Sequence, residues 1–216
     1  MICHLILTIY AMGTEGKNVS AEMKSVAESR KIVEEKMISE ITEFEIIDGI
    51  LISYNGWKET VIVPNRVTEI GRSAFKDNKT MKSILIPDTV NNISSQAFAG
   101  CDCLEEIDIP GSVRVIEGYA FMRCGNLKSV TLHEGLREIG LWAFGNCNQL
   151  KEISIPDSVK QIGQYALGFT KASYEERYIQ GMYHSFNNGF HIHHNENAAA
   201  IKYIAFHKLS LRLVRS

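Results

Sequence analysis

The residues of this chain that could carry chemistry are a histidine cluster near the C-terminal end and five cysteines. His191, His193 and His194 form the only histidine cluster, and on a strand His191 and His193 would share one face. Such a pair suits a metal ion, but a protein zinc site takes three or four ligands held by further contacts. His184 or Glu196 could join, although nothing in the spacing requires either. We therefore expect a polar strand and turn here, with no metal and no cofactor.

Three of the cysteines recur at a fixed spacing, since Cys101, Cys124 and Cys147 lie 23 residues apart. Free cysteine behaves as a small buried hydrophobe, so this spacing indicates a packing position and not a nucleophile. The pair Cys101-x-Cys103 lacks metal-finger spacing, and Cys3 is isolated. A disulfide between neighbouring cysteines of this series is possible by distance but not indicated. Because no phosphate-binding glycine loop and no G-x-S-x-G is present either, we expect no enzyme.

The cysteine spacing is one column of a 23-residue repeat. All four prolines of the chain fall in another column, in which His133 takes the one missed place. One repeat reads P-x-x-V-x-x-I-x-x-x-A-F-x-x-C-x-x-L-x-x-I-x-I. Self-similarity at such a period predicts a solenoid, in which each coil contacts only its neighbours.

The residue types in the columns predict the local structure of each coil. Ile84 and Ile86 alternate with a period of two, which favours a strand with one buried face, and the proline that follows ends the strand. The I-x-x-x-A-F stretch suits a short helical or 3₁₀ turn. The phenylalanine column predicts an aromatic spine whose rings are about 4.8 Å apart along the solenoid. Its members are Phe75, Phe98, Phe121 and Phe144.

The repeat resembles the BspA-like class of leucine-rich repeats. The stretches IPDTVNNISSQAFAGCDCLEEIDIP and HEGLREIGLWAFGNCNQLKEISIP carry the resemblance, which covers roughly residues 45–170. The resemblance implies an α/β repeat fold, a leucine-rich-repeat solenoid with parallel strands on one face and short helical or 3₁₀ turns on the other. It also implies binding of a protein or surface ligand far more often than catalysis.

Three segments follow from these patterns. Residues 1–44 form an N-terminal segment, residues 45–170 the solenoid and residues 171–216 a C-terminal cap. In the first segment, Ser20 to Ile41 reads as an amphipathic helix, which either covers the open N-terminal coil or binds a partner.

The cap is expected to run as strand, helix and strand after an irregular connection. The expected bounds are a strand over 189–193, a helix over 197–207 and a strand over 209–214.

Charge and hydropathy exclude two classes of partner. The net charge is −2 and the isoelectric point is near 6.4, which argues against nucleic acid. No apolar run reaches the roughly 18 residues of a membrane span, so we expect no membrane insertion. The start MICHLILTIYAMG lacks a positive n-region and a cleavage motif, so it gives no convincing signal peptide. The compartment stays open, although the family is often secreted or attached to surfaces, and no oligomeric state is indicated.

The predicted binding surface is the concave strand face, because residues between the buried columns must point outward. There Ile62 and Leu85 make an apolar step, and Glu106 and Asp108 place two carboxylates on the next coil. The proposed binding residues are Ile62, Leu85, Glu106, Asp108, Thr131 and Glu152. A second candidate surface is a row of aromatic residues beside the A-F turn, Tyr119, Trp142 and Tyr165.

These patterns favour a non-catalytic interaction module with a protein partner. A structural spacer or scaffold without a specific ligand is the first alternative. A metal-binding protein that uses the histidine cluster is the second.

Overall fold

The computed structural model describes residues 25–33, 43–171, 184–186 and 189–207. The chain divides into two compact units, residues 1–42 and residues 43–216. In the first unit, residues 25–33 form an α-helix inside the range expected from Ser20 to Ile41. The remainder of that expected helix lies outside the described residues, and its role as a cover or a binding helix stays a prediction.

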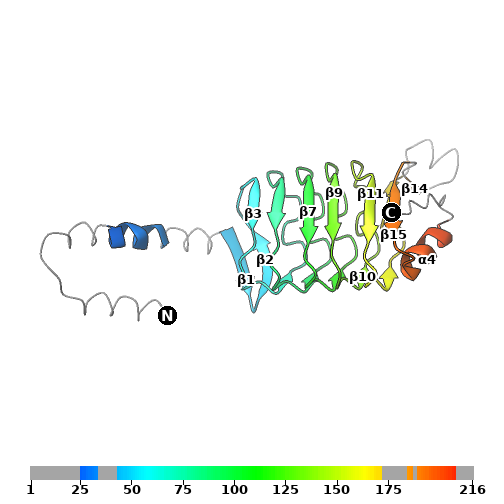
Figure 1. The fold of residues 1–216 in the computed structure, drawn as a ribbon. Helices are drawn as coiled ribbons and strands as arrows, with labels where there is room; N and C mark the ends of the chain where they lie inside the picture. The colour runs from blue at the N-terminus through cyan, green and yellow to red at the C-terminus, as the bar shows by residue number, and fades with distance from the viewer. Residues whose placement is uncertain (1–24, 34–42, 172–183, 187–188, 208–216) are drawn as a thin grey trace, which may run out of the picture. The chain divides into compact units, whose positions relative to one another are not determined.

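The second unit is a β-solenoid with two sets of strands (Figure 1). One set comprises the strands that precede the proline column and β15, which pairs with the last of them. Its members are β3 (Thr60–Ile62), β5 (Ser83–Leu85), β7 (Glu106–Ile109), β9 (Ser129–Leu132), β11 (Glu152–Ile155) and β15 (His191–His194). These strands pair in parallel as β3 with β5, β7 with β9 and β11 with β15. Their side chains alternate as expected, so that in β7 Ile107 and Ile109 are buried whereas Glu106 and Asp108 are exposed.

The other set forms a seven-stranded sheet along the opposite edge of the coils. Its strands are β1 (Phe44–Ile47), β2 (Ile50–Tyr54), β4 (Glu69–Ile70), β6 (Asn92–Ile93), β8 (Val115–Ile116), β10 (Glu138–Ile139) and β12 (Gln161–Ile162). Strand β1 is antiparallel to β2, and all other pairs are parallel. The isoleucine that recurs in each I-x-x-x-A-F stretch therefore lies in a strand and not at the start of a helical turn.

The expected short helical or 3₁₀ turns are wrong for the described coils. The residue before each alanine of the A-F pair has a positive φ, for example 60° at Gln96. This left-handed residue separates two hydrogen-bonded turns, Ala97 N to Ser94 O and Ala99 N to Gln96 O, and so prevents a continuous helix. The next peptide group bonds between coils instead, since Phe98 N donates to Ala120 O at 2.8 Å.

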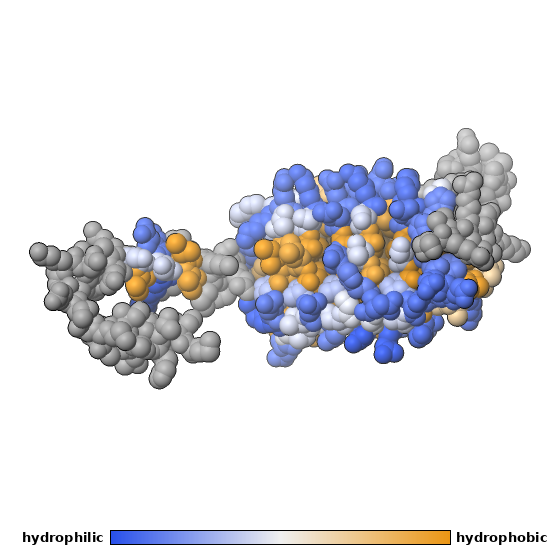
Figure 2. Space-filling model, viewed as in Figure 1, coloured by the Kyte–Doolittle hydropathy of each residue, from blue (hydrophilic) through white to orange (hydrophobic). Residues whose placement is uncertain are grey.

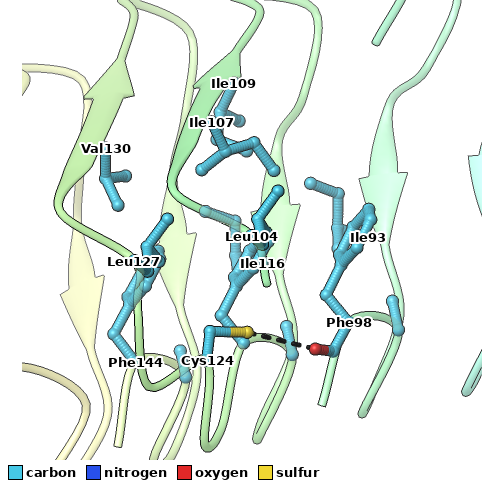
Figure 3. Close-up of a cluster of buried hydrophobic side chains, with 14 of the residues drawn as sticks. Ile93, Phe98, Leu104, Ile107, Ile109, Ile116, Cys124, Leu127, Val130 and Phe144 are labelled. Atoms are coloured by element: carbon cyan, nitrogen blue, oxygen red, sulfur yellow. Dashed lines mark hydrogen bonds between the residues drawn. The ribbon is translucent and has the colours of Figure 1, made fainter. Parts of the chain in front are cut away.

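The aromatic spine is confirmed. The rings of Phe75, Phe98, Phe121 and Phe144 stack with centroids 4.9, 4.9 and 5.0 Å apart and planes within 4° of parallel. All four side chains are buried, and aliphatic columns surround them (Figure 3). Tyr54 and Phe44 extend the aromatic contacts toward the N-terminal end with tilted rings, which the repeat did not predict.

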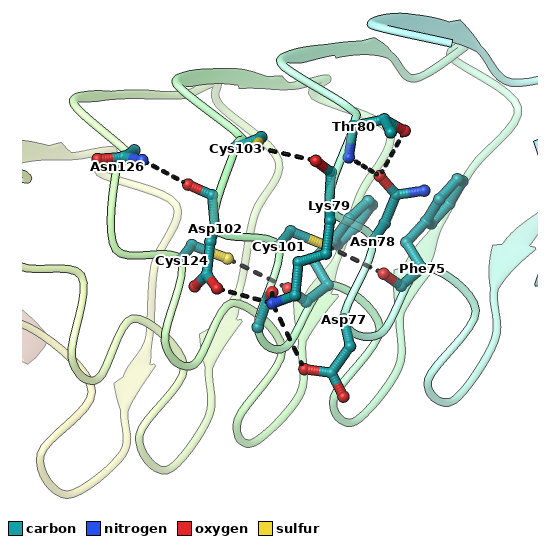
Figure 4. Close-up of polar contacts among 12 residues, drawn as sticks. Phe75, Asp77, Asn78, Lys79, Thr80, Cys101, Asp102, Cys103, Cys124 and Asn126 are labelled. Carbon is teal, nitrogen blue, oxygen red and sulfur yellow. Dashed lines mark hydrogen bonds and ion pairs between the residues drawn. The ribbon is translucent and has the colours of Figure 1, made fainter. Parts of the chain in front are cut away.

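The repeat cysteines are buried and free, as their spacing predicts. Each thiol donates to the carbonyl oxygen of the phenylalanine one coil back, for example Cys101 Sγ to Phe75 O at 3.0 Å and Cys124 Sγ to Phe98 O at 3.1 Å (Figure 4). The neighbouring Cys124 thiol and burial raise the pKa of the Cys101 thiol. These cysteines therefore satisfy a backbone acceptor and fill space between coils.

The C-terminal part adds three strands and a helix to the last coil. Strands β13 (Phe169–Lys171) and β14 (His184–Phe186) pair antiparallel, and β15 adds to β11. Helix α4 (Ala198–Phe206) begins at Asn197, whose Oδ1 accepts from Ala200 N and whose Nδ2 donates to Pro156 O. The Tyr203 hydroxyl bonds to both Leu167 N and Leu167 O at 2.9 Å. The expected strand over 209–214 lies outside the described residues, so the complete cap stays a prediction.

Candidate interaction surface

The strand face consists of the outward side chains of β3, β5, β7, β9 and β11. It contains every residue of the predicted binding surface: Ile62, Leu85, Glu106, Asp108, Thr131 and Glu152, all of which are exposed. The pleat produces this arrangement, because residues on either side of a buried isoleucine or valine must point away from the core.

The strand face is graded in polarity along the solenoid. Ile62 and Leu85 are 67% and 56% exposed, although both are large and aliphatic. Figure 2 shows apolar side chains gathered on this face over β3 and β5, with polar side chains intervening further along. An exposed aliphatic pair keeps apolar surface in contact with water and does not contribute to the core.

The charges on the strand face all have one sign. In the described strands β3 to β11, acids occupy three of the outward positions, and no lysine or arginine occupies any of them. The carboxylate of Glu106 makes no hydrogen bond or ion pair with the described residues, whereas Asp108 Oδ1 lies 2.7 Å from His133 Nε2. Glu152 Oε2 lies 3.2 Å from His193 Nε2. The charged side chains at the outward positions of this face are therefore all acidic.

The nearby lysines are neutralised at the opposite ends of the strands. Lys82 Nζ lies 2.9 Å from Glu59 Oε1, and Lys128 Nζ lies 2.6 Å from Glu105 Oε2. These are exposed pairs of small stability value, and neither lysine occupies an outward position of the strand face.

A pocket of about 380 Å³ opens at the carboxyl ends of β5, β7 and β9, beside the turns that follow them. It is lined by Ile84, Leu85, Ile86, Asp88, Asp108, Pro110, Gly111 and His133. Leu85 and Asp108 belong to the predicted surface, whereas Asp88, Gly111 and His133 were missed. A signal for two of them was present in the sequence, because His133 replaces a proline and Gly111 replaces a polar side chain in otherwise regular columns.

The sequence profile of the BspA-type leucine-rich repeat region matches residues 54–173 in six copies. The chain belongs to the BspA-type leucine-rich repeat family.

Solved structures of bacterial leucine-rich repeat proteins agree with this assignment. A leucine-rich repeat protein of T. pallidum is 30% identical, with a TM-score of 0.57 over 58% of this chain and 64% of that chain. The pneumococcal vaccine antigen PcpA shares the fold, with 21% identity and a TM-score of 0.50 over 80% of this chain and 46% of that chain. This chain thus spans less than two thirds of either protein. No curated protein matches it.

The second candidate surface of this leucine-rich repeat protein is largely packed. Trp142 is only 8% exposed, and Tyr119 and Tyr165 are half-buried against the core. Tyr165 contacts the rings of Trp142, Phe169 and His207 at centroid distances of 5.1 to 5.2 Å. Trp142 therefore packs between coils, and binding at Tyr119 or Tyr165 stays a prediction.

The histidine cluster of the repeat protein lies on β15. His191 and His193 share a face as expected, and His193 is engaged with Glu152. Within the described residues, no group of three or more histidine, cysteine, aspartate or glutamate side chains could hold a metal ion. The side chain of His184 lies outside what the structure describes, so its suggested part in a metal site stays untested.

Two further findings concern reactivity and membranes. Cys103, the most accessible described cysteine, donates its thiol to Lys79 O at 3.0 Å on the turn shown in Figure 4, with no histidine among the contacts drawn there. None of the helices in the described ranges has the length and hydropathy that a membrane crossing requires.

Proposed function

We propose that this leucine-rich repeat solenoid is a non-catalytic interaction module that binds a protein or surface ligand through its strand face. The observation that carries the proposal is the contrast within each strand. Buried positions repeat from coil to coil, whereas outward positions change from Ile62 and Leu85 to Glu106 and Asp108. Side chains that vary on a fixed scaffold, and that combine exposed aliphatic surface with exposed acids, are suited to recognition.

The family supports the same conclusion. Leucine-rich repeat solenoids present extended surfaces for binding, and the described residues combine no nucleophile with a base in a pocket. The partner is a protein of unknown identity, and neither nucleic acid nor membrane insertion is part of the proposal.

A double substitution tests the proposed surface. Leu85→Ser with Asp108→Lys removes the apolar step and reverses one charge, and we expect at least a tenfold loss of affinity for a partner isolated from host extracellular matrix or native cytoplasm. Both positions are exposed, so the free energy of unfolding should stay within about 0.5 kcal/mol of the parent.

The matched control lies on the other sheet. Glu45→Lys with Ile47→Ser, on β1, makes the same chemical changes at an aliphatic side chain that is 54% exposed. This control should bind like the parent. Equal binding by both double variants would contradict the strand face as the binding surface and would favour the spacer alternative or a surface near Tyr119.

A further inference from the structure

Two irregularities of the repeat meet in one place on the solenoid. His133 is the one non-proline of its column, and Gly111 is the one residue without a side chain in the next column. Although 22 residues separate them in the sequence, both line the pocket at the ends of β5, β7 and β9. Departures from local regularity that converge on one site favour a functional origin over a defect of packing.

Glycine at position 111 lets two coils approach closely at the edge of the pocket. A Cβ atom there would lie 2.5 Å from Glu134 O of the next coil, so the close approach of the two backbones excludes any side chain. In the flanking coils, Asp88 and Glu134 occupy the equivalent positions. Gly111 is therefore the one residue of its column that adds no side chain to this region.

The residues that line the pocket include acidic and aliphatic side chains. Leu85 is exposed and Ile86 half-buried, and together they supply apolar contact. Oδ1 of Asp108 is hydrogen-bonded to His133 Nε2, and the other carboxylate oxygen makes no hydrogen bond with the described residues. The carboxylate of Asp88 makes no hydrogen bond or ion pair among the residues the structure describes.

The nearest turn does not bring a cation of its own into this pocket. Arg114, three residues after Gly111, donates Nη1 to Gly135 O at 2.9 Å and is not among the lining residues. Among the described residues, Asp88 therefore has no cationic partner and Asp108 has only the His133 ring, so a cation supplied from outside would be favourable.

We infer that this pocket is a subsite for an arginine side chain of a partner protein, flanked in the partner by an aliphatic residue that contacts Leu85. This inference rests on the proposed function and names the chemistry of the partner. A pocket of about 380 Å³ suits one long side chain and its neighbour, being at the small end of ligand sites. Arginine fits better than lysine, because its planar guanidinium can donate two hydrogen bonds to one carboxylate and its stem can lie against aliphatic surface.

The test uses a defined peptide and the full chain. Acetyl-Leu-Arg-Leu-amide is titrated into isotope-labelled protein, and its citrulline analogue, which keeps the shape but loses the charge, is titrated in parallel. We expect amide shifts to concentrate at Leu85, Asp88, Gly111 and His133. Affinity for the citrulline peptide should be about tenfold lower, as for loss of a charged hydrogen-bonding partner.

Matched variants locate the effect. Asp88→Asn and Glu106→Gln each remove one exposed, unpaired carboxylate from the same side of the molecule, but only Asp88 lines the pocket. Asp88→Asn should weaken arginine peptide binding about tenfold, whereas Glu106→Gln should change it less than twofold. Equal losses would show attraction by the overall charge and would overturn the subsite.

The outcomes also separate this inference from the proposed function. No shifts at the pocket residues up to 5 mM peptide, a concentration set at roughly the weakest affinity measurable, would overturn the arginine subsite. The strand face would still stand if Leu85→Ser with Asp108→Lys abolished partner binding. Conversely, unchanged partner binding by that double variant would reject both the proposed surface and the subsite, because Leu85 and Asp108 line the pocket.

Discussion

The strand face and the A-F turns are built from the same 23 residues but differ in what they keep constant. On the turn side, alanine recurs in five coils, phenylalanine in four and cysteine in three, and each is buried and bonded to a neighbouring coil. On the strand face, the outward positions hold aliphatic, acidic and hydroxyl side chains in turn. The buried columns of the turn side set the distance between coils. The outward side chains of the strand face lie outside the core, so their types can vary.

The largest expected effect breaks the turn side. Phe121→Ala removes a ring that stacks on two others in the middle of the spine, and the free energy of unfolding should fall by about 3–5 kcal/mol, as for other buried Phe→Ala changes. Urea denaturation measures the change. Thr131→Ala on the strand face is the control and should stay within about 0.5 kcal/mol. A loss under about 1 kcal/mol at Phe121 would contradict the stacked core.

Thiol reactivity sharpens the same contrast. In a Cys3→Ser variant, Cys103 should react with a disulfide reagent at least about a hundredfold faster than the three repeat cysteines. Cys103 is half-exposed, whereas Cys101, Cys124 and Cys147 are buried. The pKa of the Cys101 thiol is also raised, which lowers its thiolate fraction. All four should titrate after unfolding without reductant. Fewer free thiols would instead indicate disulfides and an oxidising compartment.

A substitution at the C-terminal end of the turn side should lower the free energy of unfolding by less than one in the middle of the spine. Leu167 replaces phenylalanine in its column, and Tyr203 of α4 bonds to both of its peptide groups. Tyr203→Phe leaves a buried N–H without an acceptor, so the free energy of unfolding should fall by about 1–3 kcal/mol. The control is Tyr119→Phe, whose hydroxyl makes no hydrogen bond with the described residues. Equal effects at both positions would show that the Tyr203 hydroxyl does not hold α4 to the last coil.

The smallest effect is a pH dependence at the same end. Burial lowers the pKa of His207, whose ring contacts Tyr165, Phe169 and Tyr203. The unfolded chain then binds the proton more readily than the folded one, so this contribution is complete above the ordinary pKa of about 6.5 and is lost as the pH falls below it. In the parent protein, His207 takes up at most one proton on unfolding, and His207→Gln should abolish this uptake. The measurement is the difference in the free energy of unfolding between pH 7.5 and pH 5.5. An unchanged pH profile would contradict the buried, neutral ring.

The sequence predicted the features that depend on side-chain periodicity. Alternation placed Glu106 and Asp108 on the exposed side of β7, and recurrence placed Phe121 in the spine. What it could not predict is backbone conformation that opposes residue type. A tyrosine or tryptophan with φ near +60° is uncommon, yet Tyr119 and Trp142 both adopt it, so the expected helical turn did not form.

Contacts between distant or irregular positions were also beyond the pattern. Strand β15 joins β11 after an excursion with no repeat, and Asp88 and His133 meet in a pocket that no single column defines. The pairing of His133 with Asp108 depends on the offset between coils, which only the structure gives. The candidate surface was thus predictable in composition, and its pocket was not.

The ladder between coils also determines how a chain of this kind can change in length. Phe98 N donates to Ala120 O and Phe121 N donates to Ala143 O, so every coil presents the same donors to one neighbour and the same acceptors to the other. A duplicated or deleted block of 23 residues leaves each of these bonds with an equivalent partner. Inserting a single residue in a strand would instead turn its buried side chains outward and misalign every later bond of that coil. Such a solenoid can gain or lose recognition surface only in whole coils, and each new coil brings two outward strand positions on which selection can act independently of the fold.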